Sequence, residues 1–250
     1  RDAQESRGLG DVYKRQQYIC FNARDNTFLK KVSKGTDWSY HDYRDSSIEN
    51  YLAAADEMTK RGYSSIRMGA IVKNPIDSEN PKIIDYSVSE YRTDFNDIYL
   101  GSHCRFFLCS DGGISVIPEM FRVPVVYVNW TSIIRISTWA LNGLFIFKKF
   151  YLRDEERNMT FSEIMNLEFG DNETNEIFQN LNLELIENSE EEIRSVSIEM
   201  DERLNGTWKS SKEDIELQEE FWDLFGPEKL KNPNLRIGAE YLRNNKNLLL

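Results

Sequence analysis

Four short apolar runs, each of strand length, constrain the fold of this chain more than any other feature. The runs carry apolar residues on both faces, so each strand is expected to be covered on both sides. Segments with helical patterning separate them. This order predicts an α/β fold, a Rossmann-like open parallel sheet with helices on both faces. The runs are QYICFNA (17–23), YSSIRMGAIV (63–72), CRFFLCS (104–110) and VVYVNW (125–130).

Helix signals stand between these runs. Ser46 and Glu49 have the spacing of a capping box, and the helix that they open is expected to end at Gly62. A second helix is expected to stop at Gly101. The polar segment 30–45 is predicted to be a long loop.

The chain changes character near residue 150. Amphipathic helices are expected to dominate residues 151–250, which we interpret as a helical C-terminal extension of a Rossmann-like domain at 17–150. Residues 1–16 show no apolar periodicity and resemble a translated adaptor or assembly scar. We leave them out of the fold prediction and expect the native protein to continue upstream.

The acidic balance of the chain excludes one class of partner. The formal net charge is -11 at pH 7, which repels phosphate backbones, so nucleic acid is not an expected partner. A local basic pocket for a small anion is still compatible with this charge. Cys20, Cys104 and Cys109 form no C-x-x-C pair and indicate reduced, buried thiols in a cytoplasmic protein. No apolar run reaches membrane-spanning length.

Most familiar catalytic motifs are absent from the sequence. There is no G-x-G-x-x-G, Walker A loop, H-E-x-x-H or G-x-S-x-G, and no Asp-x-Asp metal-holding pair. With only His41 and His103, a multi-histidine metal site is not available. We therefore expect neither a bound metal nor a separate cofactor.

Polar residues follow each predicted strand. The carboxyl ends of parallel strands meet at one edge of an open α/β sheet, which is where ligands bind. The candidate binding residues at this edge are Arg24, Asp25, Arg67, Gly69, Asp85, Tyr86, Ser110, Asp111, Gly112, Gly113 and Asn129.

The turn Ser110–Gly113 has a specific physical use. Glycine lets a ligand approach the backbone closely, and the N–H groups at the start of the following helix favour a phosphate. The Asp111 carboxylate would repel a phosphate unless it caps the helix or accepts a sugar hydroxyl. The turn therefore fits either a ligand site or a tight turn with an Asp cap.

Three charged or titratable residues near these strand ends each allow two interpretations. Arg24 either binds a diphosphate through two parallel hydrogen bonds or pairs with a neighbouring aspartate such as Asp45. Arg67 needs an anionic partner, which is either a ligand or a carboxylate such as Asp85. His41, followed by an aspartate, is either a general base with its orienting acid or part of a structural loop.

The two lysines after the apolar run LFIF leave a further choice. Lys148 and Lys149 either reach a phosphate or stand at a solvated strand end.

Several stretches together resemble a bacterial family assigned as glycosyltransferases and encoded in surface-polysaccharide gene clusters. The likeness runs from about residue 18 to the end of the chain. The stretches are HDYRDSSIENYL (41–52), KRGYSSIRMGA (60–70), PKIIDYSVSEYRTDFNDIYL (81–100), CRFFLCSDGG (104–113), RVPVVYVN (122–129), IEMDERLNGTW (198–208) and RIGAEYLRNNK (236–246).

This family is similar to the carboxyl-terminal, donor-binding half of GT-B enzymes. The resemblance implies that residues 17–150 bind a nucleotide sugar without a metal. It implies that Arg24 and Ser110–Gly113 face the donor diphosphate. It also implies that Arg67, Asp85 and Tyr86 line the nucleotide side. The chain has Asn22-Ala23-Arg24 where the family leads us to expect His-x-Arg, and Asp111-Gly112 where it leads us to expect Ser-Gly.

The resemblance predicts transfer of a sugar from a nucleotide-activated donor to a bacterial surface glycan or a lipid-linked acceptor. Arg24 is expected to stabilise the leaving diphosphate, and His41 is a candidate for the base. The acceptor-binding amino-terminal domain is expected to be missing, so the fragment is expected to be inactive alone. The predicted location is the cytoplasm, with peripheral association with the inner membrane as an option. The alternatives are a nucleotide-sugar epimerase and a non-catalytic nucleotide-sugar-binding or interaction protein of a glycan pathway.

Overall fold

The computed structural model describes residues 17–133, 136, 140, 142–167, 174–225 and 235–249. The segment predicted to be a non-native scar, residues 1–16, lies outside the described residues. Within the described ranges, no helix is both long enough and apolar enough to cross a membrane.

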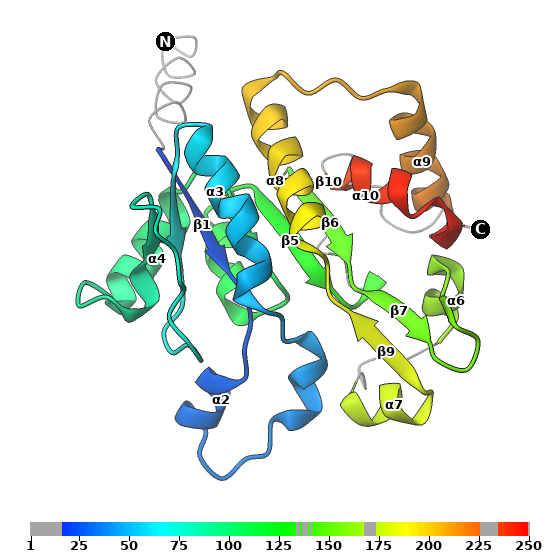
Figure 1. Ribbon diagram of the computed structural model, residues 1–250, viewed down its shortest axis with the longest axis horizontal. Coiled ribbons are helices and arrows are strands. Elements are labelled where there is room, and N and C mark those ends of the chain that lie inside the picture. The colour runs from blue at the N-terminus through cyan, green and yellow to red at the C-terminus, as the bar shows by residue number, and fades with distance from the viewer. Residues whose placement is uncertain are drawn as a thin grey trace.

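Seven parallel strands form the central sheet in the order β10-β6-β5-β4-β1-β2-β3 (Figure 1). The predicted Rossmann-like parallel sheet is confirmed, and the four predicted strands are β1, β2, β4 and β5. The strand β1 has β2 on one side and β4 on the other, so the direction in which strands are added reverses beside β1. The strands are β1 (Tyr18–Asn22), β2 (Ser64–Arg67), β3 (Ile83–Asp85), β4 (Phe107–Cys109), β5 (Val125–Trp130), β6 (Gly143–Phe147) and β10 (Leu235–Ile237).

The remaining elements include a second, antiparallel sheet in the order β8-β7-β9, formed by β7 (Lys149–Leu152), β8 (Arg157–Asn158) and β9 (Leu183–Ile186). The described helices are α2 (Thr27–Val32), α3 (Leu52–Lys60), α4 (Asp94–His103), α5 (Val116–Met120), α6 (Phe161–Asn166), α7 (Asn175–Asn180), α8 (Glu190–Asn205), α9 (Lys212–Asp223) and α10 (Ala239–Asn244). Short 3₁₀ segments are η1 (Ser39–Arg44), η2 (Ile48–Tyr51), η3 (Tyr86–Val88), η4 (Gly113–Ser115) and η6 (Lys246–Leu248).

Helices cover both faces of the sheet, as the sequence predicts. On the face covered by α3, the Ser65 hydroxyl donates to the carbonyl oxygen of Ala55 at 2.8 Å. On the opposite face, the Cys20 thiol donates to the carbonyl oxygen of Leu100 in α4 at 3.6 Å. Ile19 is in register with Ser65, and successive side chains of a strand point to opposite faces. The strand β1 is therefore buried by helices on both sides.

The first predicted helix begins later than its capping pattern indicates. The Ser46 hydroxyl lies 3.1 Å from the hydroxyl of Tyr51, and the Glu49 carboxylate accepts a hydrogen bond from the Ser47 hydroxyl. Neither side chain caps α3, which follows η2 with Tyr51 as its uncapped N-terminal residue. The predicted loop at 30–45 contains the end of α2 and all of η1.

The second half of the chain contains the predicted helices and also strands that its pattern does not show. The strand β10 extends the seven-stranded sheet beside β6, and β9 pairs with β7. Buried side chains of both halves belong to one hydrophobic core, which runs from Ile19 to Leu248 in the sequence. The predicted boundary near residue 150 therefore does not coincide with a break in the sheet or in the core.

Candidate functional site

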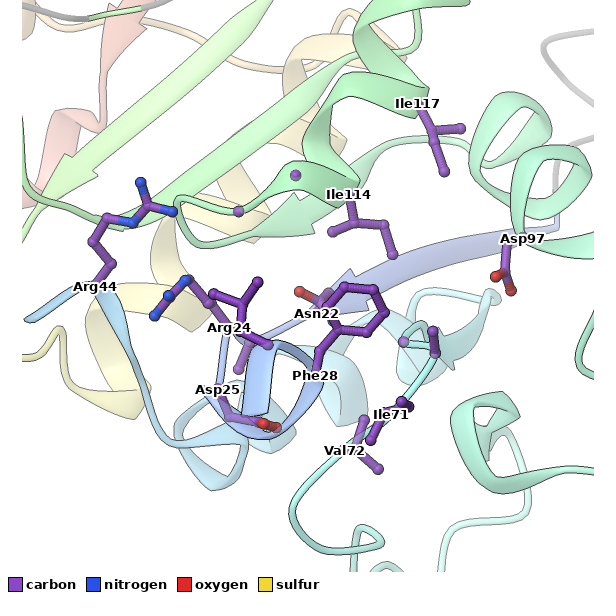
Figure 2. Close-up of a pocket in the computed structure, with 16 residues that line it drawn as sticks. Asn22, Arg24, Asp25, Phe28, Arg44, Ile71, Val72, Asp97, Ile114 and Ile117 are labelled. Carbon is purple, nitrogen blue, oxygen red and sulfur yellow. The ribbon is translucent and has the colours of Figure 1, made fainter. Parts of the chain in front are cut away.

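A cavity of about 390 Å³ opens at the carboxyl ends of β1, β2 and β4, where the strand order reverses. In open α/β sheets this reversal is where ligands bind. Figure 2 shows Arg24 and Arg44 at one end of the cavity and Asp97 at the other. Most of the wall between them is apolar and is formed by Phe28, Ile71, Val72, Ile114 and Ile117. The amide of Asn22 lies among these side chains, and the predicted site residue Asp25 lines the cavity next to Arg24.

Arg24 is fixed at the polar end of this cavity, two residues after β1. It is only 8% exposed, and its backbone N–H donates to Ser110 Oγ at 2.8 Å. Its Nη1 donates to the carbonyl oxygen of His41 at 3.1 Å and forms an ion pair with Asp45. Its Nη2 is buried and has no hydrogen-bond partner within the described residues. One nitrogen of a well-positioned guanidinium therefore lacks an acceptor within the described residues.

The glycine turn lies against Arg24. A side chain at Gly112 would place its Cβ 3.8 Å from the Cβ of Arg24. The Ser115 N–H and hydroxyl both donate to the carbonyl oxygen of Gly112, at 3.1 and 3.0 Å, which fixes the shape of the turn. In the part of the chain that the structure describes, no group accepts from the N–H of Gly112 or Gly113. These two amides are therefore unpaired donors in a turn whose Gly112 packs against the first carbons of the Arg24 side chain.

The helix after this turn is shorter than the sequence predicts. It consists of η4 followed by the five residues of α5, so the helix dipole contributes little and the free amides themselves are the main attraction for an anion. Gly112 has an extended backbone (φ -160°), and a Cβ at Gly113 would meet no atom within 4 Å. Glycine is useful here because it leaves the amides uncovered.

Arg44 is a cavity residue that the sequence reasoning missed. Its Nε lies 3.7 Å from Asp111 Oδ2, and both side chains are about one quarter exposed. The pairing draws the Asp111 carboxylate to Arg44, and Asp111 does not line the cavity. Arg44 lies in the segment YHDYRD (40–45), in which the sequence pattern drew attention only to His41, the aspartate after it and Asp45. The cavity therefore has two guanidinium groups at its polar end.

The second predicted arginine site lies outside this cavity. Arg67 is 2% exposed, and its Nη1 donates to the carbonyl oxygen of Asn74 at 2.7 Å and to Asp85 Oδ2 at 3.2 Å. The same Asp85 oxygen accepts from the N–H of Ile76 at 2.9 Å. Arg67 and Asp85 thus fix the loop between β2 and β3. Arg67 lines a neighbouring hollow of about 290 Å³, and it does not reach the cavity beside Arg24.

Tyr86 and Asn129, both predicted at strand ends, bind other parts of the protein. The Tyr86 hydroxyl donates to the carbonyl oxygen of Thr93 at 3.2 Å and accepts from its N–H at 3.0 Å. The N–H and Oδ1 of Asn129 bond reciprocally with Asn188, at 2.6 and 2.7 Å, and its Nδ2 donates to the Tyr51 hydroxyl at 3.3 Å. Neither residue lines the cavity.

The two lysines after β6 fit neither of the alternatives drawn from the sequence. Lys148 is buried and donates to the carbonyl oxygens of Tyr43 and Asp45, at 3.0 and 2.6 Å. Lys149 pairs with Glu192 at 2.7 Å. Lys148 therefore holds the segment that carries Arg44, and burial lowers its own pKa.

His41 lies next to the polar end without lining the cavity. Its ring packs on Tyr40 with centroids 4.0 Å apart, and its backbone oxygen accepts from Arg24. Burial, followed by the positive charges of Arg44 and Arg24, lowers the pKa of His41, so the ring is neutral at neutral pH. A neutral imidazole is able to accept a proton, and the role of His41 as a base stays a prediction.

The protonation state of Asp45 determines how strongly the positive charge of Arg24 attracts an external anion. Burial raises the pKa of Asp45 to about 6, an effect that Arg24 only partly offsets. Above pH 6 the carboxylate is charged and neutralises Arg24, whereas below pH 6 it becomes neutral. We expect Asp45→Asn to tighten sulfate binding at pH 8 by roughly three- to tenfold and to reduce its dependence on pH.

Sulfate is a suitable probe of Asp45 because its own charge is constant between pH 5 and 8. Calorimetric titration across this range measures the effect. Asp37→Asn, which removes an exposed carboxylate from the same segment, is the matched control and is expected to leave sulfate affinity unchanged. Equal sulfate affinity of Asp45→Asn and wild type at pH 8 would contradict the coupling.

Comparisons with known protein families, with curated proteins and with solved structures find no match to this chain. Among the described residues, no three His, Cys, Asp or Glu side chains are grouped so that they could hold a metal ion. The geometry of the cavity is therefore the main basis for a functional conclusion.

Proposed function

We propose that this chain is the donor-binding half of a GT-B-type glycosyltransferase and binds a nucleoside diphosphate sugar in the cavity at the strand reversal. One observation carries the proposal. Two guanidinium groups, Arg24 and Arg44, and the amides of Gly112 and Gly113 line one end of a cavity whose walls are largely apolar, and the carboxylate of Asp25 lies at the same end. This arrangement suits a ligand with a diphosphate at one end and a flat, largely apolar ring at the other.

The same groups suit the chemistry of sugar transfer. When the bond between the anomeric carbon and the diphosphate oxygen breaks, negative charge develops on the leaving diphosphate. Donors that are already held in place stabilise this charge without reorganising. Arg24 is held in this way by Ser110, by the carbonyl oxygen of His41 and by Asp45. The free Nη2 of Arg24 and the two glycine amides are the groups that we assign to the diphosphate.

The finer parts of the proposal rest on the sequence resemblance. It supports a bacterial surface glycan or a lipid-linked molecule as the acceptor, a second domain that binds it, and action in the cytoplasm. It also supports transfer without a metal. Because the acceptor is assigned to another domain, the direct test of this chain is binding of the donor.

Titration calorimetry with the diphosphates of uridine, guanosine, cytidine and adenosine, and with their sugar conjugates, tests the proposal. We expect at least one of them to bind. We expect Arg44→Gln to weaken this binding about tenfold, because it removes a charge-assisted contact to phosphate. Arg153→Gln, the same change at a 58% exposed side chain beside β7, is expected to leave binding unchanged.

Two outcomes of this titration decide between the alternatives. If no nucleoside diphosphate or conjugate binds the wild-type chain, the proposal is wrong. If a conjugate binds and its sugar is recovered with an inverted ring carbon, the protein is an epimerase instead.

A further inference from the structure

Asp97 stands at the end of the cavity opposite the two arginines (Figure 2). It lies in the first turn of α4, and its side chain is 16% exposed. Its Oδ2 accepts from Arg92 Nη2 at 2.8 Å. Its Oδ1 is buried and has no hydrogen-bond partner among the residues that the structure describes. The phenol of Tyr86 lies within hydrogen-bond reach of Asp97, and its proton is donated to the carbonyl oxygen of Thr93 at 3.2 Å.

An unpaired, buried carboxylate oxygen is uncommon because leaving it without a donor costs free energy. A donor from a bound ligand would remove this cost. Most side chains between the two ends, which include Phe28, Ile71 and Ile114, are apolar and suit the faces of a flat ring, and the amide of Asn22 lies among them. A ligand with its diphosphate at Arg24 therefore extends its ring toward Asp97.

We propose that Asp97 reads the base of the nucleotide and selects guanine. This inference rests on the proposed function, because the diphosphate at Arg24 determines which end of the ligand reaches Asp97. A carboxylate only accepts hydrogen bonds, so it matches a base edge that presents adjacent donors. Guanine presents N1–H and the 2-amino group side by side.

The other common bases place an acceptor where the carboxylate requires a donor. The N–H of uracil lies between two carbonyl oxygens. In adenine and cytosine the amino group lies next to a ring nitrogen that accepts. Each of these bases would place lone pairs against Asp97, and a site built for particular donors discriminates strongly against ligands that lack them.

The test compares guanosine, inosine, xanthosine and uridine diphosphates by calorimetry on the whole chain. Inosine keeps the N1–H of guanine and lacks its 2-amino group. We expect guanosine diphosphate to bind the wild type about tenfold more tightly than inosine or uridine diphosphate. This comparison needs no variant, so it stays decisive even if a substitution at Asp97 prevents folding.

The variant Asp97→Asn is expected to change the preferred ligand from guanosine diphosphate to xanthosine diphosphate. It should lose the preference for guanosine diphosphate and bind xanthosine diphosphate about tenfold more tightly than wild type does, because its amide donates to the carbonyl oxygen at C2 of xanthine. Loss of structure alone would not produce this gain. Asp94→Asn, on the same helix with a 97% exposed side chain that also contacts Arg92, is the matched control and should behave as wild type.

The outcomes separate this inference from the proposed function. If uridine or cytidine diphosphate binds as tightly as guanosine diphosphate, and binding depends on Arg44, the inference about Asp97 is overturned and the proposed function stands. If no nucleoside diphosphate binds, both are overturned.

Discussion

Arg24→Ala is expected to weaken the binding of a nucleoside diphosphate by roughly ten- to a hundredfold. A hydrogen bond to a charged group contributes about 1.5–3 kcal/mol, and Nη2 of Arg24 has no hydrogen-bond partner among the described residues. In a protein that transfers sugar, the same change is expected to slow the reaction by about a hundredfold to a thousandfold. Calorimetry measures the first effect, and release of the nucleoside diphosphate measures the second.

The control for Arg24→Ala must account for Asp45, which loses its ionic partner in this variant. A carboxylate left unpaired in a largely buried site destabilises the fold. The double variant Arg24→Met with Asp45→Asn removes both charges and keeps most of the side-chain volume. We expect it to fold like wild type and still to bind poorly. Wild-type affinity in either variant would show that Arg24 does not contact the ligand.

The sequence predicted the polar end of the cavity only in part. Arg24 and the turn Ser110–Gly113 follow β1 and β4, and these strands are neighbours at the reversal, so the two predicted groups meet. Arg67 and Asp85 follow the next strands along the sheet and pair with each other instead. A strand end identifies the edge of the sheet to which a residue belongs. It does not show whether a neighbouring side chain already neutralises that residue.

The two charged cavity residues that the sequence did not predict, Arg44 and Asp97, lie in segments whose local patterns carry no information about the cavity. Arg44 is in a 3₁₀ segment within a polar stretch that looked like a loop, and Asp97 is inside a helix. Asn129 is the opposite case: it is a predicted binding residue that does not line the cavity. Its left-handed backbone (φ 54°) and its bonds to Asn188 give it a structural place at the end of β5. For Arg44 and Asn129 the deciding partner, Asp111 or Asn188, is far away in the sequence.

The fold was easier to predict than the site because apolar runs and helical stripes are local signals. The stripe of α8 is an example, since Ile193, Val196 and Met200 are all buried, as an amphipathic helix requires. The strand β10 has only three residues, Leu-Arg-Ile, and its single apolar–polar–apolar alternation is too short to mark it as part of the sheet. Its place beside β6 depends on tertiary packing.

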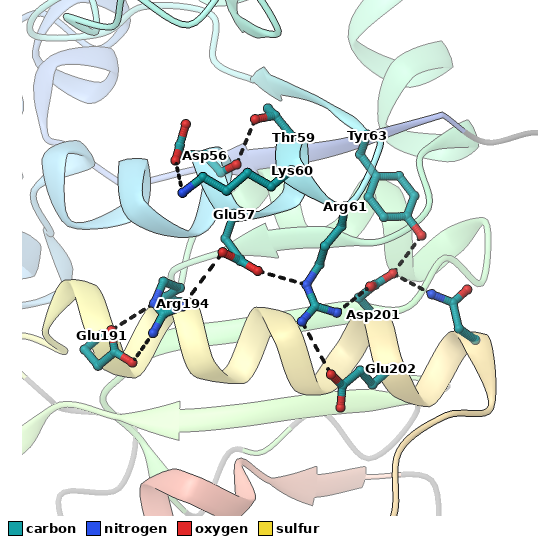
Figure 3. Close-up of polar contacts among 11 residues, drawn as sticks. Asp56, Glu57, Thr59, Lys60, Arg61, Tyr63, Glu191, Arg194, Asp201 and Glu202 are labelled. Carbon is teal, nitrogen blue, oxygen red and sulfur yellow. Dashed lines mark hydrogen bonds and ion pairs between the residues drawn. The ribbon is translucent and has the colours of Figure 1, made fainter.

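Polar contacts join the helices of the two halves of the chain. Arg61, at the end of α3, contacts Asp201 at 3.1 Å and Glu202 at 3.4 Å on α8 (Figure 3). The Tyr63 hydroxyl donates to the same aspartate at 2.7 Å. Exposed ion pairs contribute little individually, but Asp201 is nearly buried and accepts hydrogen bonds from Arg61, Tyr63 and Asn205. The helix α8 is therefore fixed on the first half of the chain as well as on the sheet.

Phe221→Ala is expected to lower the free energy of unfolding by about 3–5 kcal/mol, the largest stability effect among these predictions. Phe221 lies in α9 and is fully buried, with ring centroids 5.9 Å from Phe147 of β6 and 5.2 Å from Phe161 of α6. Its loss leaves a cavity where the end of the sheet meets the later helices. Urea unfolding, followed by circular dichroism and by tryptophan fluorescence, measures the change.

Because both halves share one core, we expect the two signals to give a single coincident transition in wild type and in Phe221→Ala. Ile215→Ala, on the same helix at a side chain that is 48% exposed, is the matched control and should change stability by no more than about 0.5 kcal/mol. An early transition in which the helical signal falls while the sheet stays folded would mean that residues 151–250 unfold as a separate unit. That result would support the domain boundary predicted near residue 150.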